Sequence, residues 1–249
     1  MIYNDFSKIY DRFQEIDYDA FIDFYKALFE RIGFNPKTVV DLGCGSGAVT
    51  LRLKRAGYDV AGIDISPDML AIAQNKADEE NLDILFLNMD MCEFQLPEPV
   101  DCVISALDCV NYLESIADVR AAFEHVCSSL NPGGVFIFDI NSEYKLTEIL
   151  GNNTFVYEDD SAYCVWDCGY FPEDNVVSFD LNFFINDRDG GYSRYKEYQE
   201  ETVYSIDEIT SLLSECGFKN IEVYGNLYFE KPKPDTERIF FVARKAPVS

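Results

Sequence analysis

The sequence predicts an α/β protein in which a parallel sheet has helices on both faces and carries an inserted antiparallel segment. Two observations predict this fold. Up to about residue 150, short β-branched runs alternate with helical stretches, as in parallel strands joined by crossover helices. After Gly151 the chain is rich in Tyr, Phe, Trp and acidic residues. Between the turn signals, apolar and polar residues alternate with a period of two, as they do in antiparallel strands.

The α/β part begins with two helices and continues with five strands. Apolar side chains recur at helical spacing over residues 5–33, until Pro36 ends the pattern. Ser66 followed by Pro67 marks a helix start, and residues 131–134 (Asn-Pro-Gly-Gly) mark a helix stop and turn. The expected strands are 38–42, 59–63, 84–87, 100–104 and 135–140, and the expected helices between them are 48–56, 67–80 and 116–130.

The inserted segment is expected to form antiparallel strands after the fifth strand. Apolar and polar residues alternate in segments 176–185 and 192–204. Turn-forming residues, among them Pro, Asp, Asn and Gly, mark turns at 172–175 and 187–191. Beyond the insertion, Ser205 and Glu208 have the spacing of a capping box at a helix start. Two last strands are expected at 220–224 and 238–244. The predicted organisation is one α/β domain, residues 1–151 and 205–249, with an inserted antiparallel β lid at 152–204.

The composition limits the partners. The chain has 249 residues, with 45 acidic and 20 basic side chains and a formal charge of −25. Its 48% of hydrophobic residues suffice for a core, which excludes disorder of the whole chain. The negative charge disfavours nucleic acids and anionic membrane surfaces, because phosphate binding needs Lys and Arg. A neutral or cationic small molecule fits better.

The expected location is cytoplasmic. No stretch approaches the ~18 apolar residues of a membrane span, and Met1 to Asp5 lacks the start of a secretion signal. The eight cysteines include no CxxC pair, so they are expected to be free and mostly buried in a reducing compartment. A disulfide or metal at Cys164 and Cys168 is the disfavoured alternative.

A glycine-rich turn over residues 41–47, Asp-Leu-Gly-Cys-Gly-Ser-Gly, joins the first expected strand to its helix. Its glycines allow a sharp bend and the close approach of a ligand to the backbone. The spacing from Gly43 also satisfies a loose dinucleotide fingerprint. Asp41 favours S-adenosylmethionine instead, because a carboxylate repels a pyrophosphate and either attracts the cationic groups of this ligand or holds the loop.

Two further acids lie at strand ends. Asp64 closes the second expected strand, where a carboxylate can accept hydrogen bonds from both ribose hydroxyls. Asp90 follows the third expected strand beside Met89 and Met91, so an adenine amino group and ring could be bound there. A solvated strand-end or turn acid is the alternative for each. The glycine-rich turn with Asp41 and the strand-end Asp64 together are a much stronger signal than either alone, whereas Asp90 adds a weaker one.

With these motifs the sequence resembles class I S-adenosylmethionine-dependent methyltransferases over about residues 36–150 and 205–245. The turn at 41–47 matches the family's first motif, Asp64 its ribose acid and Asp90 its adenine acid. The resemblance implies a Rossmann-like seven-stranded sheet, with the seventh strand antiparallel between the fifth and sixth. It also implies S-adenosylmethionine as cofactor. The cofactor-binding residues expected on this basis are Tyr3, Tyr10, Asp41, Gly43, Cys44, Gly45, Asp64, Ile65, Met69, Asp90, Met91 and Ala106.

The N-terminal segment and the insertion extend this resemblance. Residues 3–11 are similar to the first helix of small-molecule N- and O-methyltransferases, which folds over the cofactor and brings a tyrosine to its methionine end. Tyr10, and less directly Tyr3, would then line the cofactor site, with a place in the helix core as the alternative. The insertion resembles the substrate-covering sheet of the glycine N-methyltransferase-like group in position only. Its aromatic residues, such as Trp166, fit either a pocket for a cationic amine or, as the favoured interpretation, the sheet core.

The loop after the fourth strand holds the catalytic candidates Asp108, Asn111 and Tyr112, because ligands of open α/β sheets bind at the carboxyl ends of the strands. Asp108 could orient or deprotonate an amine, and a loop or helix cap is the alternative for each of the three. His125, the single histidine, lies among apolar residues of a helix and is expected to be structural. No metal site is expected.

The expected function is transfer of a methyl group from S-adenosylmethionine, by in-line displacement, to a small-molecule nitrogen or oxygen nucleophile. A cationic amine is one candidate. An Asn-Pro-Pro-Tyr-type motif is missing, which counts against DNA bases and protein amides as acceptors. Neither a nucleic acid nor a membrane is expected as partner, and the protein is expected as a monomer or homodimer. The alternatives are an NAD(P)-dependent oxidoreductase and a non-catalytic S-adenosylmethionine-binding module.

Overall fold

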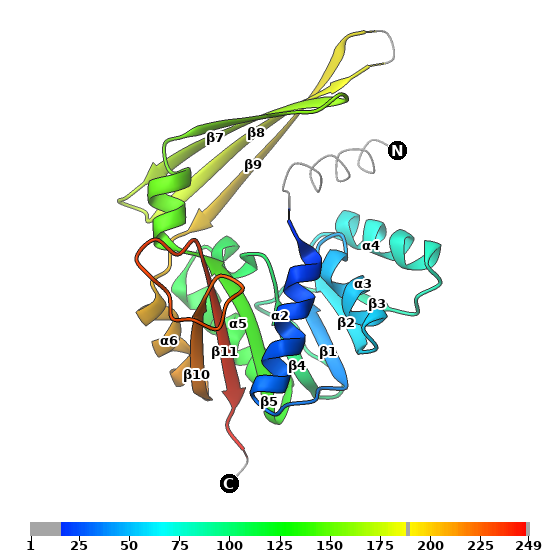
Figure 1. Cartoon of the computed structure of the whole chain (residues 1–249), viewed down its shortest axis with the longest axis vertical. Coiled ribbons are helices and arrows are strands. Elements are labelled where there is room, and N and C mark those ends of the chain that lie inside the picture. The colour runs from blue at the N-terminus through cyan, green and yellow to red at the C-terminus, as the bar shows by residue number, and fades with distance from the viewer. Residues whose placement is uncertain (1–15, 188–189, 248–249) are drawn as a thin grey trace.

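The computed structural model describes residues 16–187 and 190–247. They form a large seven-stranded sheet with helices on both faces and a separate four-stranded sheet beyond one end of it (Figure 1). The large sheet has the order β10-β11-β5-β4-β1-β2-β3. Its strands are β1 (Thr38–Leu42), β2 (Asp59–Asp64), β3 (Leu85–Asn88), β4 (Val100–Ser105), β5 (Leu130–Asn141), β10 (Phe218–Gly225) and β11 (Arg238–Lys245).

The strand directions match the predicted fold class. β1 to β5 pair in parallel, and β11 runs antiparallel between β5 and β10. The sheet therefore has a topological switch point at β1, from which the chain proceeds to β2 on one side while β4 lies on the other. Such a switch point opens a crevice at the carboxyl ends of the strands, where ligands of this architecture bind.

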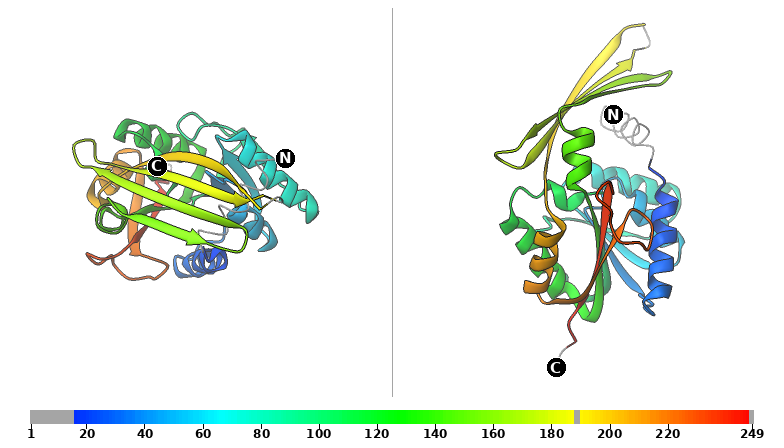
Figure 2. Two further views of the ribbon diagram at one scale, coloured as in Figure 1. Left: turned by 90° about the horizontal axis from the view of Figure 1, so that it is seen from above. Right: turned by 60° about the vertical axis from the view of Figure 1, so that its left-hand side comes forward.

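Helices cover both faces of the large sheet (Figure 2), and a separate hydrophobic core fills the space on each face. Successive strand residues point to opposite faces, so Val39 packs with α2 and α3 while Val40 packs with α5 and α6. Burial on both faces explains why these strands are nearly continuous hydrophobic runs. The helices are α2 (Tyr18–Arg31), α3 (Ala48–Arg55), α4 (Pro67–Glu79), α5 (Ile116–Ser129) and α6 (Ile206–Glu215).

Local helix signals behave as the sequence predicts. Ser66 accepts a hydrogen bond from the Met69 amide and Pro67 is the first residue of α4. Ser205 and Glu208 form both bonds of a capping box at α6. Of the two expected N-terminal helices, the second is α2, whereas residues 5–15 of the first lie outside the described residues. Among the residues that are described, no helix combines the length and apolar character needed to cross a bilayer.

One local expectation holds in part, and one element was not predicted. The helix stop expected at residues 131–134 is confirmed, because α5 ends at Ser129. The expected turn instead lies within β5, which begins at Leu130 and pairs there with Val100 of β4. The pairing of β5 with β4 shifts register between Val100 and Cys102, so residues 131–134 form an irregular stretch within the strand. Gly133 in this stretch has a φ of +77°. The six residues Lys145–Leu150 form a π-helical turn that no sequence signal predicted.

The small sheet consists of β6 (Thr154–Glu158), β7 (Ala162–Phe171), β8 (Val176–Asn186) and β9 (Tyr192–Thr202), in that order and all antiparallel. Its inner face packs on the π-helical turn through a core that includes Leu146, Val177 and Phe179. These contacts place the small sheet over the carboxyl-terminal edge of the large one (Figures 1 and 2).

Candidate active site

A cavity of about 460 Å³ lies between the two sheets. The large sheet contributes the glycine-rich turn after β1 and the loop after β4, and the small sheet contributes side chains from all four of its strands. A second hollow of about 590 Å³ adjoins it near the ends of β2 and β3. The two share Gly43, Cys109 and Tyr112, so together they form a continuous cleft along the switch point.

The glycine-rich turn is shaped by its own backbone. Gly43 has a φ of +76°, and a Cβ atom there would lie 2.6 Å from the Cys109 sulfur. The Gly43 and Cys44 amides both donate to the Ile63 carbonyl, which ties the turn to β2. Only glycine fits this conformation and this close approach. The turn therefore leaves its backbone open toward the cleft.

Asp41 lies beneath this turn and is 1% exposed. Its carboxylate accepts a hydrogen bond of 2.5 Å from the Thr50 hydroxyl. Burial raises its pKa to about 7, and the Thr50 bond opposes that rise. Among the described residues no cation pairs with Asp41. This buried carboxylate at the cavity wall is suited to a cationic ligand group.

Asp64 and Asp90 hold backbone at the second hollow. Asp64 accepts hydrogen bonds from the Gly45 amide (2.7 Å) and the Ser66 amide (2.8 Å). Asp90 accepts one from the Cys92 amide (2.8 Å). Each carboxylate oxygen can accept a further bond, so both acids can hold their loops and still face a ligand.

The structure brings together the predicted cofactor residues that it describes. The first cavity is lined by Asp41, Gly43, Cys44, Gly45, Met69 and Ala106, and the second hollow by Asp64, Ile65, Asp90 and Met91. Tyr3 and Tyr10 lie outside the described residues. Two adjoining hollows, each with acids at strand ends, fit the methionine and adenosine halves of S-adenosylmethionine.

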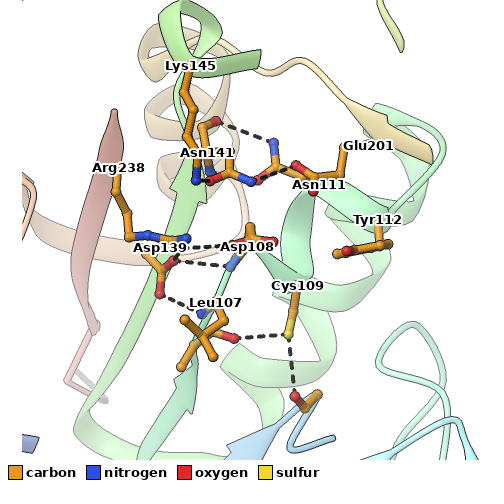
Figure 3. A network of polar contacts seen from close by, with 12 residues as sticks. Leu107, Asp108, Cys109, Asn111, Tyr112, Asp139, Asn141, Lys145, Glu201 and Arg238 are labelled. Carbon is orange, nitrogen blue, oxygen red and sulfur yellow. Dashed lines mark hydrogen bonds and ion pairs between the residues drawn. The ribbon is translucent and has the colours of Figure 1, made fainter. Parts of the chain in front are cut away.

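Asp108 belongs to a buried ion-pair network (Figure 3). Arg238 donates to Asp108 (2.8 Å) and to Asp139, which is fully buried. Asp139 also accepts from the Leu107 and Asp108 amides, and both of these residues have a positive φ. Burial alone would lower the pKa of Arg238, but Asp139 and Asp108 raise it. The network fixes the loop after β4 and engages the Asp108 carboxylate.

Asn111 and Tyr112 differ in their surroundings. Asn111 is completely buried, accepts from the Asn141 amide (2.9 Å) and donates to the Thr202 carbonyl (3.0 Å). It therefore joins the large sheet to β9. Tyr112 is 41% exposed, lines both hollows and donates to the Gln199 side chain (3.1 Å). Of the three predicted catalytic residues, Asp108 and Tyr112 line the cleft and Asn111 lies behind it.

Sequence reasoning missed Glu201 and Lys145. Glu201 is 4% exposed, lines the cavity and accepts a 2.8 Å hydrogen bond from the Asn141 side chain. Lys145 donates to the same Asn141 side chain (2.8 Å, Figure 3). Burial raises the pKa of Glu201 to about 8, with Asp108 adding to the rise. Both faces of β9 carry polar side chains, so alternation in the sequence could not indicate that Glu201 points inward.

Aromatic side chains of the small sheet form the opposite wall of the cavity. Trp166 packs edge-on against Phe179, with ring centroids 5.5 Å apart, and its Nε1 is buried without a partner among the described residues. Trp166 thus belongs both to the sheet core and to the cavity lining. Phe171, another aromatic residue of the insertion, is 50% exposed and is not among the residues that line the cavity.

The cysteines and the histidine play no visible part in a metal site. All eight cysteines are free thiols. Cys164 and Cys168 lie four residues apart on one strand, too far apart for a disulfide along an extended backbone. His125 packs against Phe94. Across residues 16–187 and 190–247, no group of three or more His, Cys, Asp or Glu could hold a metal ion.

Comparisons with known proteins agree with this geometry. Residues 39–134 match a family model described as a methyltransferase domain. The chain is 34% identical over 247 residues, 98% of its own length and 100% of the relative's, to a protein of Geobacillus sp. (strain WCH70) assigned to the methyltransferases. It is 28% identical over 221 residues, 84% of its length and 76% of the relative's, to a glycine/sarcosine N-methyltransferase of Aphanothece halophytica.

A solved structure gives the same result. The crystal structure of an S-adenosylmethionine-dependent methyltransferase from Clostridium acetobutylicum ATCC 824 has a TM-score of 0.90 at 31% identity. The match covers 99% of this chain and 100% of that one. The chain therefore belongs to the class I S-adenosylmethionine-dependent methyltransferases and is an enzyme that uses S-adenosylmethionine as its cofactor.

Proposed function

We propose that the enzyme methylates the nitrogen of a small cationic amine that lies in the cavity between the two sheets. The observation that carries this proposal is the pairing of a buried carboxylate, Glu201, with an aromatic wall that includes Trp166 and Phe179. A cation is stabilised by a carboxylate and by the faces of aromatic rings. The similarity to a glycine/sarcosine N-methyltransferase supports the same acceptor class.

The residues along the first cavity and the second hollow fit S-adenosylmethionine. We propose that Asp41 lies near its ammonium, Asp64 accepts from its ribose hydroxyls, and Asp90 accepts from its adenine amino group. The cofactor, when bound, supplies a methyl group made electrophilic by a sulfonium. The chain itself contributes position and a shielded site, which together can account for several kcal/mol of the barrier. An NAD(P)-dependent oxidoreductase is disfavoured because Asp41 would repel a pyrophosphate.

The small sheet is proposed to form the substrate-covering unit, residues 152–204 inserted between 1–151 and 205–249. All four of its strands contribute to the cavity wall, so its side chains would select the acceptor. The cytoplasmic location, the monomeric or homodimeric state and the lack of nucleic-acid and membrane partners stay predictions from the sequence. They play no part in the argument for the acceptor.

The test is transfer of an isotope-labelled methyl group from S-adenosylmethionine to pairs of compounds that differ in one functional group. Glycine, sarcosine and D-glucosamine carry the amine, whereas glycolate and D-glucose carry a hydroxyl in its place. We expect labelled product, identified by mass spectrometry, from at least one amine and from neither hydroxyl compound. Transfer to hydroxyl compounds alone would contradict an amine acceptor while leaving the methyltransferase assignment intact.

A further inference from the structure

Glu201 is held at the cavity wall from two directions. Its backbone lies in β9, opposite Val177 of β8, and the next residue accepts from Asn111. Its Oε2 accepts from the Asn141 side chain at the end of β5. Its Oε1 has no hydrogen-bond partner in the part of the chain that the structure describes. One oxygen is thus fixed by the protein, and the other is available to a bound molecule.

The other carboxylates of the cavity wall are less available. Asp108 is paired with Arg238. Asp41 accepts from Thr50 beneath the glycine-rich turn, on the cofactor side. Glu237 is exposed to solvent. Glu201 is therefore the buried carboxylate that faces the acceptor side of the cavity without an ion pair of its own.

The charges facing Glu201 come from each element packed around it. Asp108 in the loop after β4 raises its pKa, whereas Lys145 in the π-helical turn and Arg238 in β11 lower it. Asn141 of β5 donates a hydrogen bond that also lowers it. Burial outweighs these favourable contacts, and the pKa is about 8. A carboxylate with a pKa near the working pH is suited to take up a proton and release it again.

We infer that Glu201 is the catalytic base, accepting a proton from the ammonium group of the bound acceptor before methyl transfer. The inference rests on the proposed amine acceptor. The ammonium N–H bond breaks and its proton moves to the Glu201 carboxylate, which leaves a lone pair on nitrogen. The nitrogen then bonds to the methyl carbon as the bond from that carbon to sulfur breaks. The products are a methylated ammonium, S-adenosylhomocysteine and one proton, which leaves Glu201 for solvent.

A first experiment detects the contact without turnover. The protein is saturated with S-adenosylhomocysteine at pH 7, and infrared difference spectra are recorded on adding methylammonium chloride. A bound cation should ionise Glu201, so a protonated-carboxyl band should disappear in the wild type. The band change should be absent in Glu201→Gln and retained in Glu200→Gln, which makes the same change at the exposed neighbour. An unchanged spectrum in the wild type, or an equal change in Glu201→Gln, would overturn the inference.

A second experiment compares two nucleophiles with S-adenosylmethionine. Methylamine has a pKa close to the ~10.4 of a lysine ammonium and is cationic at pH 8, whereas methoxyamine is neutral there and needs no base. Glu201→Gln should lower kcat/KM for methylamine about 100-fold and for methoxyamine less than about twofold. The wild-type rate with methylamine should level off above pH 8, whereas that of the variant should keep rising toward the pKa of the amine.

The outcomes separate the two proposals. If the wild type methylates both compounds and Glu201→Gln does so equally well, Glu201 is not the base and the amine acceptor still stands. If the variant loses both activities by the same factor, Glu201 shapes the cavity instead of moving a proton. If the wild type methylates neither of these compounds and none of glycine, sarcosine and D-glucosamine, the proposed acceptor class fails and the role of Glu201 fails with it.

Discussion

The cofactor side and the acceptor side of the cavity are built in different ways. On the cofactor side the partners are close in sequence, as in the bond between Asp64 and Gly45, 19 residues apart. On the acceptor side they are distant: Asn141 and Glu201 are 60 residues apart, and Arg238 and Asp108 are 130 apart. The cofactor side therefore depends on short motifs at strand ends, whereas the acceptor side depends on how segments far apart in the chain pack together.

The largest expected effect lies in the acceptor-side network. Arg238→Met should lower the free energy of unfolding by ~3–5 kcal/mol, because it leaves the fully buried Asp139 without a counter-charge and removes the ion pair of Asp108. Urea unfolding measures this loss. Arg120→Met is the matched control, because Arg120 pairs with Glu215 at the solvent-exposed surface, where an ion pair contributes little to stability. Equal losses in the two variants would mean that the network does not stabilise the fold.

The second prediction concerns the pH dependence of stability on the two sides. The pKa of Asp41 is raised from 3.8 to about 7, so the folded state binds the proton more tightly than the unfolded chain. Its contribution to the free energy of unfolding therefore falls as pH rises from about 4 to about 7, by at most ~4 kcal/mol. For Glu201, the contribution to the free energy of unfolding likewise falls as pH rises from about 4.5 to about 8.

Urea unfolding over a pH series separates these contributions. Asp41→Asn should remove the decrease in stability that occurs up to about pH 7. Glu201→Gln should remove the decrease in stability that extends to about pH 8. Saturating S-adenosylhomocysteine should shrink only the Asp41 contribution, because its ammonium would favour the ionised form of that carboxylate. A variant whose pH curve parallels that of the wild type would exclude the raised pKa at that position.

The third prediction compares two glycines of the same turn. Gly43→Ala should destabilise the protein by ~2 kcal/mol more than Gly45→Ala, although both positions have a positive φ. The new Cβ at Gly43 would lie 2.6 Å from the Cys109 sulfur, whereas nothing lies within 4 Å at Gly45. Thermal unfolding without ligand measures the difference. Equal losses of stability in the two variants would show that the loop after β4, which holds Cys109, moves aside at little cost.

The smallest expected effect concerns the affinity for the cofactor product. Asp64→Ala should weaken the binding of S-adenosylhomocysteine at least tenfold, about 1.4 kcal/mol, because the carboxylate can no longer accept from the ribose. Calorimetry measures the affinity. Asp83→Ala, which removes an exposed acid just after α4, is the control and should bind normally. Unchanged affinity in Asp64→Ala would refute the ribose assignment.

Much of the fold and of the cofactor side could be predicted from the sequence. β1 was predicted to the residue, and the starts of α4 and α6 follow from Ser66 with Pro67 and from Ser205 with Glu208. These signals are local, because a cap or a buried strand is encoded within a few residues. The turn expected at 131–134 instead lies within β5, because pairing with β4 outweighs a local turn signal. The π-helical turn escaped prediction because its apolar residues pack against a sheet that follows it in the chain.

By itself, the sequence determined the fold class, the glycine-rich turn and the acids at the strand ends. Parallel strands of one sheet end at the same edge, so residues that follow those strands must meet there. Only the tertiary structure decided that Glu201 points into the cavity, that Arg238 engages Asp108, and that Asn111 lies behind the cleft. The contacts of Glu201 and Asn111 depend on the packing of the small sheet on Lys145–Leu150, and the contact of Arg238 with Asp108 depends on the position of β11 beside β5. The physical reason is that these contacts join segments far apart in the chain, whose relative position no local pattern encodes.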